Sequence, residues 1–232
     1  MIPMPLLLIA TRNAHKVAEV RQILGEGFGL LTLNDFPDAP AVIEDAGTFA
    51  GNATKKILSL AGWLSQNPAK ASAAIPGQTR LHILADDSGL EVDALGGAPG
   101  VHSARFAANG SGGGNAPDAA NNAKLLQLLE TVPAERRTAR FRCVLAMIPV
   151  NFPRTTAAAA PFAPDQVVIF DGACEGIISR TASGAGGFGY DPLFVPAGFT
   201  QSFAALGGAT KNSLSHRARA LAKLRQYFST RA

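Results

Sequence analysis

Two adjacent carboxylates, Asp86 and Asp87, are the side chains of this chain best suited to chemistry. They follow an apolar run containing Leu81, Ile83 and Leu84, which predicts a buried strand that ends at the two acids. Adjacent carboxylates in such a place repel each other and lose solvation unless a cation lies beside them. Mg2+ takes oxygen ligands and usually brings phosphate oxygens with it, so the pair predicts a divalent-cation site. A solvated acidic turn is the alternative that this stretch alone leaves open.

A third acid, Glu44, precedes a helix that we expect to begin near Thr48. A carboxylate at this place can favour the helix dipole, or it can supply a further oxygen ligand to the cation. The same helix carries Lys55 and Lys56. We expect one of these lysines to reach the site and the other to be solvated.

A strand, a polar turn and a helix near the N-terminus have the features of a phosphate cradle. Leu6–Ala10 predicts a strand that is covered on both faces, and the turn Thr11–Asn13 leads into the helix. Lys16 lies in the first turn of that helix, where the dipole disfavours a cation unless an anion is bound. Many strand-to-helix turns carry such residues without a ligand, so both interpretations stay open here.

The glycine-rich stretch 184–189 matches the pattern G-x-G-x-x-G. A dinucleotide site is rejected, because no helical pattern follows and no acid downstream of Asp191 can hold a ribose. The glycines would instead let the backbone approach a flat ligand, with Phe188 or Tyr190 available to stack on a base. A plain turn before a strand is the alternative.

The C-terminal segment is basic and is expected to form the last helix, which Lys211–Arg217 opens with Ser213 or Ser215 as its N-cap. His216 and Arg217 then crowd the helix start, where an anion would be favoured. No acid follows Asp191. Such a segment can bind nucleic acid, face the acidic stretch through a polyphosphate and metal, or present a solvated helix face.

Length and composition describe a folded chain. Its 232 residues are 47% hydrophobic and 16% charged, with a net charge of +4, which fits one large domain or two lobes sharing a sheet. Cys143 and Cys174 are far apart and predict reduced core residues. We find no signal peptide and no apolar stretch of membrane-spanning length, and expect a cytoplasmic protein.

Further elements follow from the pattern along the chain. Leu90–Leu95 predicts a half-exposed strand after the acids, and Asp118 is expected to cap a leucine-rich helix. Strands are also expected at 140–148, 166–170 and 176–179. Surface loops without chemistry are expected near 65–80, 109–117 and 151–165.

These motifs occur together and in order, and the set resembles one family, the inosine/xanthosine triphosphate pyrophosphatases. The likeness runs from about residue 6 to 225 and is carried by Thr11-x-Asn13-x-x-Lys16, Glu44, Thr48-Phe49-x-x-Asn52-Ala53, Ala85–Leu90, Gly96–Gly100, Ser103–Arg105, Gly186–Pro192 and Ser215–Arg217. Each motif is weak alone, and their order makes the signal strong. The chain departs from the pattern at Arg12, Ala46 and His102, where glycine, glycine and an aromatic residue are usual.

The resemblance implies a fold and an activity. The fold would be α/β, with an elongated central mixed sheet flanked by helices and two lobes around a cleft, in a single domain over residues 1–232. The activity would be Mg2+-dependent hydrolysis of non-standard purine nucleoside triphosphates (ITP, dITP and XTP) to monophosphate and pyrophosphate. The protein would be a homodimer and would bind neither membranes nor nucleic acid.

The resemblance also assigns roles to residues. Glu44 and Asp86 would bind Mg2+ together with Asp87, which would act as the base that activates water. The triphosphate would be held by Thr11, Asn13, Lys16, Lys56 and Lys211. The sugar and base would be surrounded by Ser88, Phe188, Gly189, Tyr190, Asp191, His216 and Arg217.

Two rival functions stay open at this point. A related triphosphate pyrophosphatase could prefer other bases, such as modified pyrimidines. A non-catalytic nucleotide or nucleic-acid binder could use the basic C-terminal segment, with salt-sensitive binding and no pyrophosphate release. The second rival leaves Glu44, Asp86 and Asp87 without a role.

Overall fold

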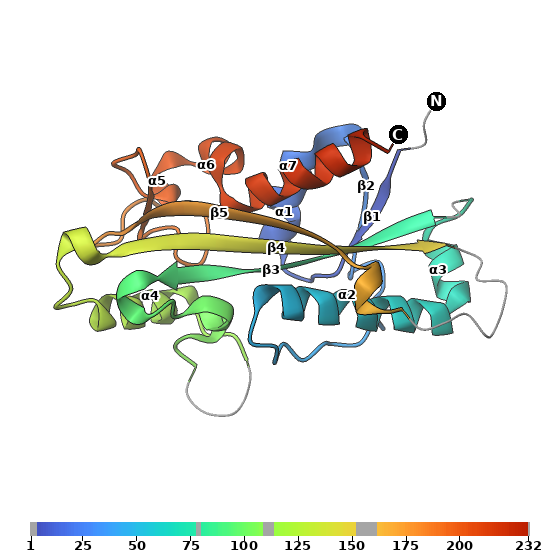
Figure 1. Cartoon of the computed structure of the whole chain (residues 1–232), viewed down its shortest axis with the longest axis horizontal. Coiled ribbons are helices and arrows are strands. Elements are labelled where there is room, and N and C mark those ends of the chain that lie inside the picture. The colour runs from blue at the N-terminus through green and yellow to red at the C-terminus, as the bar shows by residue number, and fades with distance from the viewer. Residues whose placement is uncertain (1–3, 78–79, 109–113, 152–161, 232) are drawn as a thin grey trace. The chain divides into compact units, whose positions relative to one another are not determined.

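The computed structural model describes residues 4–77, 80–108, 114–151 and 162–231. Its strands form one six-stranded sheet in the order β2-β1-β3-β4-β5-β6 (Figure 1). Strand β1 is parallel to β2 and β3, whereas β5 and β6 are antiparallel, so the predicted α/β fold with a mixed sheet is confirmed. The strands are β1 (Leu6–Ile9), β2 (Gly29–Thr32), β3 (Arg80–Val92), β4 (Thr138–Asn151), β5 (Val168–Ile178) and β6 (Phe194–Pro196).

Helices separate the first four strands along the chain, and the last three α-helices follow β6. The helices are α1 (Ala14–Leu24), α2 (Phe49–Gln66), α3 (Pro68–Ala74), α4 (Asp118–Leu128), α5 (Phe203–Leu206), α6 (Gly208–Leu214) and α7 (His216–Ser229), with the short 3-10 helix η3 at Gly100–Arg105. Among the described residues, no helix is both long enough and apolar enough to cross a membrane.

The chain divides into two compact units that are each built from separate segments. The first comprises the described residues of Met1–Asp87, Val144–Phe170 and Leu221–Ala232, and the second those of Ser88–Cys143 and Asp171–Ala220. The boundaries fall inside β3, β4 and β5, so each of these strands contributes to both units.

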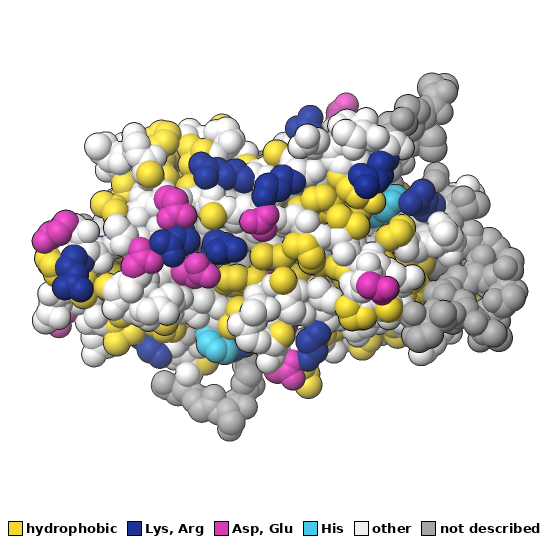
Figure 2. Space-filling model, in the orientation of Figure 1, with side chains coloured by type: hydrophobic (Ala, Val, Ile, Leu, Met, Phe, Trp, Pro, Cys, Tyr) yellow, Lys and Arg dark blue, Asp and Glu magenta, His cyan; other side chains and the backbone are white. Residues whose placement is uncertain are grey.

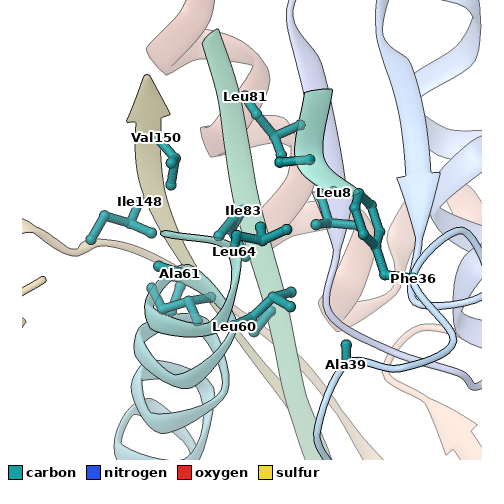
Figure 3. Packing of buried hydrophobic residues seen from close by; sticks show 14 of the residues in the cluster. Leu8, Phe36, Ala39, Leu60, Ala61, Leu64, Leu81, Ile83, Ile148 and Val150 are labelled. Atoms are coloured by element: carbon teal, nitrogen blue, oxygen red, sulfur yellow. The ribbon is translucent and has the colours of Figure 1, made fainter. Parts of the chain in front are cut away.

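The first unit has a core between the sheet and α2. Leu60, Ala61 and Leu64 of α2 lie beside Ile83 of β3 and Ile148 of β4 (Figure 3). All five are buried. Core residues recur on α2 at helical spacing. On the strands they recur at alternate positions, as Leu81 and Ile83 do on β3 and Ile148 and Val150 on β4. These spacings are why the segments form the helix and strands that the sequence predicts. Full burial of each large apolar side chain contributes about 1.5–3 kcal/mol.

Strand β3 is longer than predicted. The expected strand end at Asp86 and Asp87 is wrong, because β3 continues through both acids to Val92 and includes the first half of the expected strand Leu90–Leu95. The neighbouring strand β1 does end there, since Ile9 pairs with Leu84 in its last register position. The acids thus lie just past the carboxyl end of β1, although not at the end of their own strand.

Two further predicted features differ from the structure. Residues 65–80 are not one loop, because α3 begins at Pro68, which suits a first helical position, and it buries Ala71. The expected strands at 166–170 and 176–179 are one continuous strand, β5. Of the other expected loops, residues 109–113 and 152–161 lie outside the described residues.

The second unit has an aromatic core. The ring of Phe194 on β6 lies 4.7 Å from that of Phe141 on β4 and 5.2 Å from that of Phe203 on α5. Helix α4 adds the buried Leu125 to this core. Asp118 does not cap α4 as predicted, because it is the first helical residue and its carboxylate binds elsewhere.

Candidate active site

The carboxylates of Asp86 and Asp87 are nearly buried in β3 and are paired with lysines from two helices. Lys16 Nζ of α1 lies 2.5 Å from Asp86 Oδ1, and the Asp86 side chain is 2% exposed. Lys56 Nζ of α2 lies 3.2 Å from Asp87 Oδ1, and the Asp87 side chain is 8% exposed. Successive strand side chains point to opposite faces, which explains why neighbouring acids meet lysines from different helices.

Glu44 joins this cluster through Lys56. Its Oε2 lies 2.9 Å from Lys56 Nζ, which also donates to the backbone oxygen of Asp86 at 3.3 Å. Lys56 is therefore the lysine of α2 that reaches the acids. Lys55 instead pairs with the exposed Asp45.

The environment of Asp87 is suited to a base. Burial raises the pKa of the Asp87 carboxyl, Lys56 and Lys16 lower it, and the net result lies above the usual value. For Lys56, burial lowers the pKa, but Asp87 and Glu44 outweigh this effect and the net pKa is raised. The lysine therefore keeps its positive charge beside the acids.

Asn52 is a member of this cluster to which the sequence analysis assigned no role. It is fully buried on α2; its Nδ2 donates to Asp87 Oδ2 at 3.1 Å, and its Oδ1 accepts from the Ala46 amide at 2.9 Å. One side chain thus connects the general-base candidate with the segment that follows Glu44. The sequence does carry a sign of this role, because Asn52 is an amide residue among the buried positions of α2, where Phe49 and Ala53 are its neighbours. A buried amide needs hydrogen-bond partners.

The predicted phosphate turn leads into α1 as expected. Asn13 is the N-cap of α1, because its Oδ1 accepts from the Lys16 amide at 3.1 Å, and Thr11 Oγ1 accepts from the Asn13 amide at 3.1 Å. The amides at the start of such a helix favour an anion. The Arg12 side chain binds the backbone after β2, because its Nη2 donates to the backbone oxygen of Ala39 at 2.8 Å.

The second unit gathers another part of the predicted site around Asp191. Asp191 Oδ2 accepts from Lys211 Nζ at 2.6 Å and from the Phe188 amide at 2.9 Å. Both charged side chains are almost fully buried. Lys211 Nζ also lies 4.4 Å from the centre of the Phe188 ring, which places a cation over an aromatic face.

The other predicted base and sugar residues are largely buried in this unit. Arg217 Nη2 donates to Ser88 Oγ at 3.0 Å, and the His216 ring stacks on Phe141 at 4.9 Å. Tyr190 is 3% exposed and its hydroxyl donates to the Ser103 backbone oxygen at 2.9 Å. Burial raises the pKa of Tyr190 well above its usual value, and Asp118 adds to this effect. Tyr190 therefore stays a neutral donor.

The glycine-rich stretch forms a loop that leads into β6, so the expectation that no helix follows it directly is confirmed. Gly187 has φ +75°, and a Cβ there would lie 2.2 Å from Asp191 Oδ2. Glycine is therefore required where the backbone approaches Asp191. Phe188, which is only half-buried, follows directly.

The carboxylates of the first unit fit Mg2+ in one of its usual modes. Among the described residues, no three His, Cys, Asp or Glu groups are gathered as a ready-made metal cluster. Mg2+ does not require one, because it is commonly held by one or two carboxylates together with substrate phosphates and water. Glu44 and Asp86 offer such oxygen ligands, beside lysines that suit phosphate.

Comparison with known proteins places the chain in a family. Residues 7–227 match the model of the Ham1 family. The chain is 47% identical over 218 residues to a protein named dITP/XTP pyrophosphatase from Desulforamulus reducens, covering 94% of this chain and 92% of the relative. A protein of the same name from Geobacter sulfurreducens is 46% identical over 222 residues, covering 95% of each.

Solved structures agree with this match. A HAM1 protein from Coxiella burnetii has a TM-score of 0.73 at 33% identity, covering 98% of this chain and 100% of that one. A structure of a nucleoside-triphosphatase, dITP/XTP pyrophosphatase, from Mycobacterium abscessus has a TM-score of 0.63 at 36% identity, covering 94% of this chain and 98% of the other. The chain therefore belongs to the Ham1 family.

Proposed function

We propose that the protein hydrolyses non-standard purine nucleoside triphosphates (ITP, dITP and XTP) to monophosphate and pyrophosphate, with Mg2+ as cofactor. The observation that carries this proposal is the cluster of Asp86, Asp87 and Glu44 with Lys16 and Lys56. Buried acids beside lysines suit a reaction in which a metal and cations neutralise phosphate charge. The names of near-full-length relatives point to the same activity.

The three acids of the first unit would have different roles in the reaction. Mg2+ held by Glu44 and Asp86 would neutralise charge on the phosphates. Asp87 would accept the proton of a water whose oxygen attacks the α-phosphorus, as pyrophosphate leaves. A raised pKa makes the Asp87 carboxylate a better proton acceptor than an ordinary aspartate.

The triphosphate would be bound by cations and by the start of α1. Lys16 and Lys56 would exchange part of their contact with the acids for contact with phosphate oxygens. Thr11 and Asn13 would add hydrogen bonds at the N-terminal end of α1. Lys211 is proposed as a further phosphate ligand.

Base recognition is proposed for the second unit. Phe188 is the aromatic side chain of the glycine-rich loop with surface left for stacking on a purine, whereas Tyr190 is buried. A 6-keto purine accepts hydrogen bonds and adenine's 6-amino group donates them, so donors such as His216 and Arg217 would reject adenine. Sites built on such hydrogen bonds discriminate by about 10^4–10^5. Ser88, Gly189 and Asp191 would complete the surroundings of sugar and base.

The remaining features are proposed from the family alone. These are a homodimer, a cytoplasmic location, and a single domain with two lobes around a cleft. A nucleic-acid binder is the weaker alternative, because it leaves the buried Asp86 and Asp87 without a role. On the one face drawn in Figure 2, Lys and Arg side chains lie among Asp and Glu side chains. A preference for other bases is the alternative that a substrate panel would test.

The first prediction is pyrophosphate release from ITP and XTP far above that from ATP, with Mg2+ and not with EDTA. Asp87→Asn should lower turnover of ITP by about 10^2–10^4-fold while the protein stays folded and binds nucleotide. Asp45→Asn is the matched control, since this exposed acid pairs with Lys55 and should leave turnover unchanged. Near-normal turnover of Asp87→Asn would contradict the role of Asp87 as the base. Release of pyrophosphate from no triphosphate by the wild-type protein would contradict the proposed function.

A further inference from the structure

Helix α4 holds both backbone groups of Gly189 in the glycine-rich loop. Asp118 Oδ2 accepts from the Gly189 amide at 2.6 Å, and Asn122 Nδ2 donates to the Gly189 oxygen at 2.9 Å. The two side chains are four residues apart on α4 and therefore lie on the same face of the helix. Neither residue belongs to the motifs that carried the sequence resemblance.

This clamp fixes a backbone segment that carries the stacking candidate Phe188. Gly189 has φ +62°, a left-handed conformation that the two hydrogen bonds hold in place. The Phe188 amide is bound by Asp191, so the backbone is fixed on both sides of the Phe188 carbonyl group. The clamp therefore fixes the backbone from which the Phe188 ring extends, and this ring lies 4.4 Å from Lys211 Nζ.

Helix α4 is itself anchored, so it can act as a rigid support. Asn121 is buried; its Oδ1 accepts from the Ala107 amide at 2.8 Å and its Nδ2 donates to the Ala104 oxygen at 3.3 Å. Leu125 on the same helix is fully buried in the core of the second unit. Asp118 lies in the first turn, where the helix dipole favours a carboxylate.

We propose that Asp118 and Asn122 are positioning residues that set base selectivity by holding the Phe188–Gly189 segment. This inference rests on the proposed function, because it assumes that Phe188 stacks on the base and thereby places the 6-position of the purine against the hydrogen-bond donors of the second unit. The two residues act through the loop and do not touch the reacting phosphates. Their replacement should therefore weaken nucleotide recognition more than the chemical step.

The decisive variants remove one hydrogen bond each. Asp118→Ala and Asn122→Ala should speed amide hydrogen exchange of a peptide spanning Gly189 in nucleotide-free protein. They should also raise KM for ITP about five- to ten-fold, the loss expected for one hydrogen bond, with kcat within about two-fold. The ratio of kcat/KM for ITP over ATP should fall.

Two comparisons guard against a merely structural effect. Asp118→Asn keeps an acceptor oxygen for the Gly189 amide and should restore much of the selectivity lost in Asp118→Ala. Gln127→Ala changes an exposed residue of the same helix and should leave exchange and kinetics unchanged. If Asn122→Ala fails to fold, Asn122→Asp is used, because it keeps the size and removes the donor.

The outcomes separate the two proposals. Unchanged exchange in both alanine variants would overturn the clamp, and faster exchange with unchanged KM and unchanged ITP-to-ATP ratio would overturn its role in selectivity. If the wild-type protein released pyrophosphate from no nucleotide, the proposed function would fail, and exchange would still decide whether α4 holds Gly189. Faster exchange together with higher KM and lower selectivity supports both.

Discussion

At the scale of the residue, Asp87 is held at a cost to stability. Its folded pKa is raised above the ordinary value of 3.8, first of all by burial, so the folded state binds a proton more tightly than the unfolded chain. The contribution of Asp87 is fully present below pH 3.8 and is lost as pH rises through the raised pKa. Proteins often accept such a cost where a functional group needs it.

In EDTA no bound Mg2+ can oppose the raised pKa of Asp87. The free energy of unfolding should fall less steeply with rising pH in Asp87→Asn than in wild type above pH 3.8. Urea denaturation at a series of pH values measures both slopes, and Asp45→Asn serves as the control. Equal slopes for wild type and Asp87→Asn would show that the Asp87 carboxyl titrates as an ordinary acid.

At the scale of the element, the start of α7 explains how two predicted site residues are placed. The sequence left Ser213 and Ser215 open as N-caps. In the structure Ser215 Oγ accepts from the Ala218 amide at 3.2 Å, whereas Ser213 Oγ donates to Thr210 within α6. Ser215 thereby fixes the first turn of α7, which carries His216 and Arg217.

We therefore expect the two serines to differ in their effect on stability. Ser215→Ala should lower the free energy of unfolding by about 1 kcal/mol, which corresponds to a fall of about 2–4 °C in Tm for a chain of this size. Ser213→Ala should change stability by less than about 0.5 kcal/mol, because the residue is exposed and alanine suits a helix. Calorimetry compares the two; a larger effect of Ser213→Ala would contradict the capping assignment.

The elements also show which patterns the sequence could reveal. Apolar stripes located α1, α2 and α7, because helix amphipathicity is a local property. The continuation of β3 through Asp86 and Asp87 could not be predicted, since polar residues interrupt the apolar run while pairing with neighbouring strands keeps the chain extended.

Contacts between distant segments were the other limit. The acids and lysines of the first unit could be named from their motifs, but the pairing of Lys16 with Asp86 and Lys56 with Asp87 depends on where helices meet strands. The contacts of Asn52, Asp118 and Asn122 were missed for the same reason, because an amide or acid on a helix has no local sign that its partner is a remote backbone group or carboxylate.

At the scale of the whole molecule, the division into two units does not follow the order of the chain. The core of the first unit combines α2 and β3 with Ala146, Ile148 and Val150 of β4. A fragment that ends at Asp87 would contain the predicted Mg2+ ligands and phosphate turn, but it would lack this part of β4 and all of α7. Its apolar core surface would be left exposed to water.

The fragment Met1–Asp87 should therefore show no cooperative unfolding transition alone, measured by circular dichroism during heating. Mixing it with the fragment Ser88–Ala232 should recover a transition if the two chains restore the missing β4 contacts. Cooperative unfolding of Met1–Asp87 by itself would show that α2, β1 and β3 form a sufficient core. Failure to fold would instead mean that the elements carrying the acids and lysines depend on residues more than fifty positions later, since Ala146, Ile148 and Val150 belong to the same core as α2 and β3.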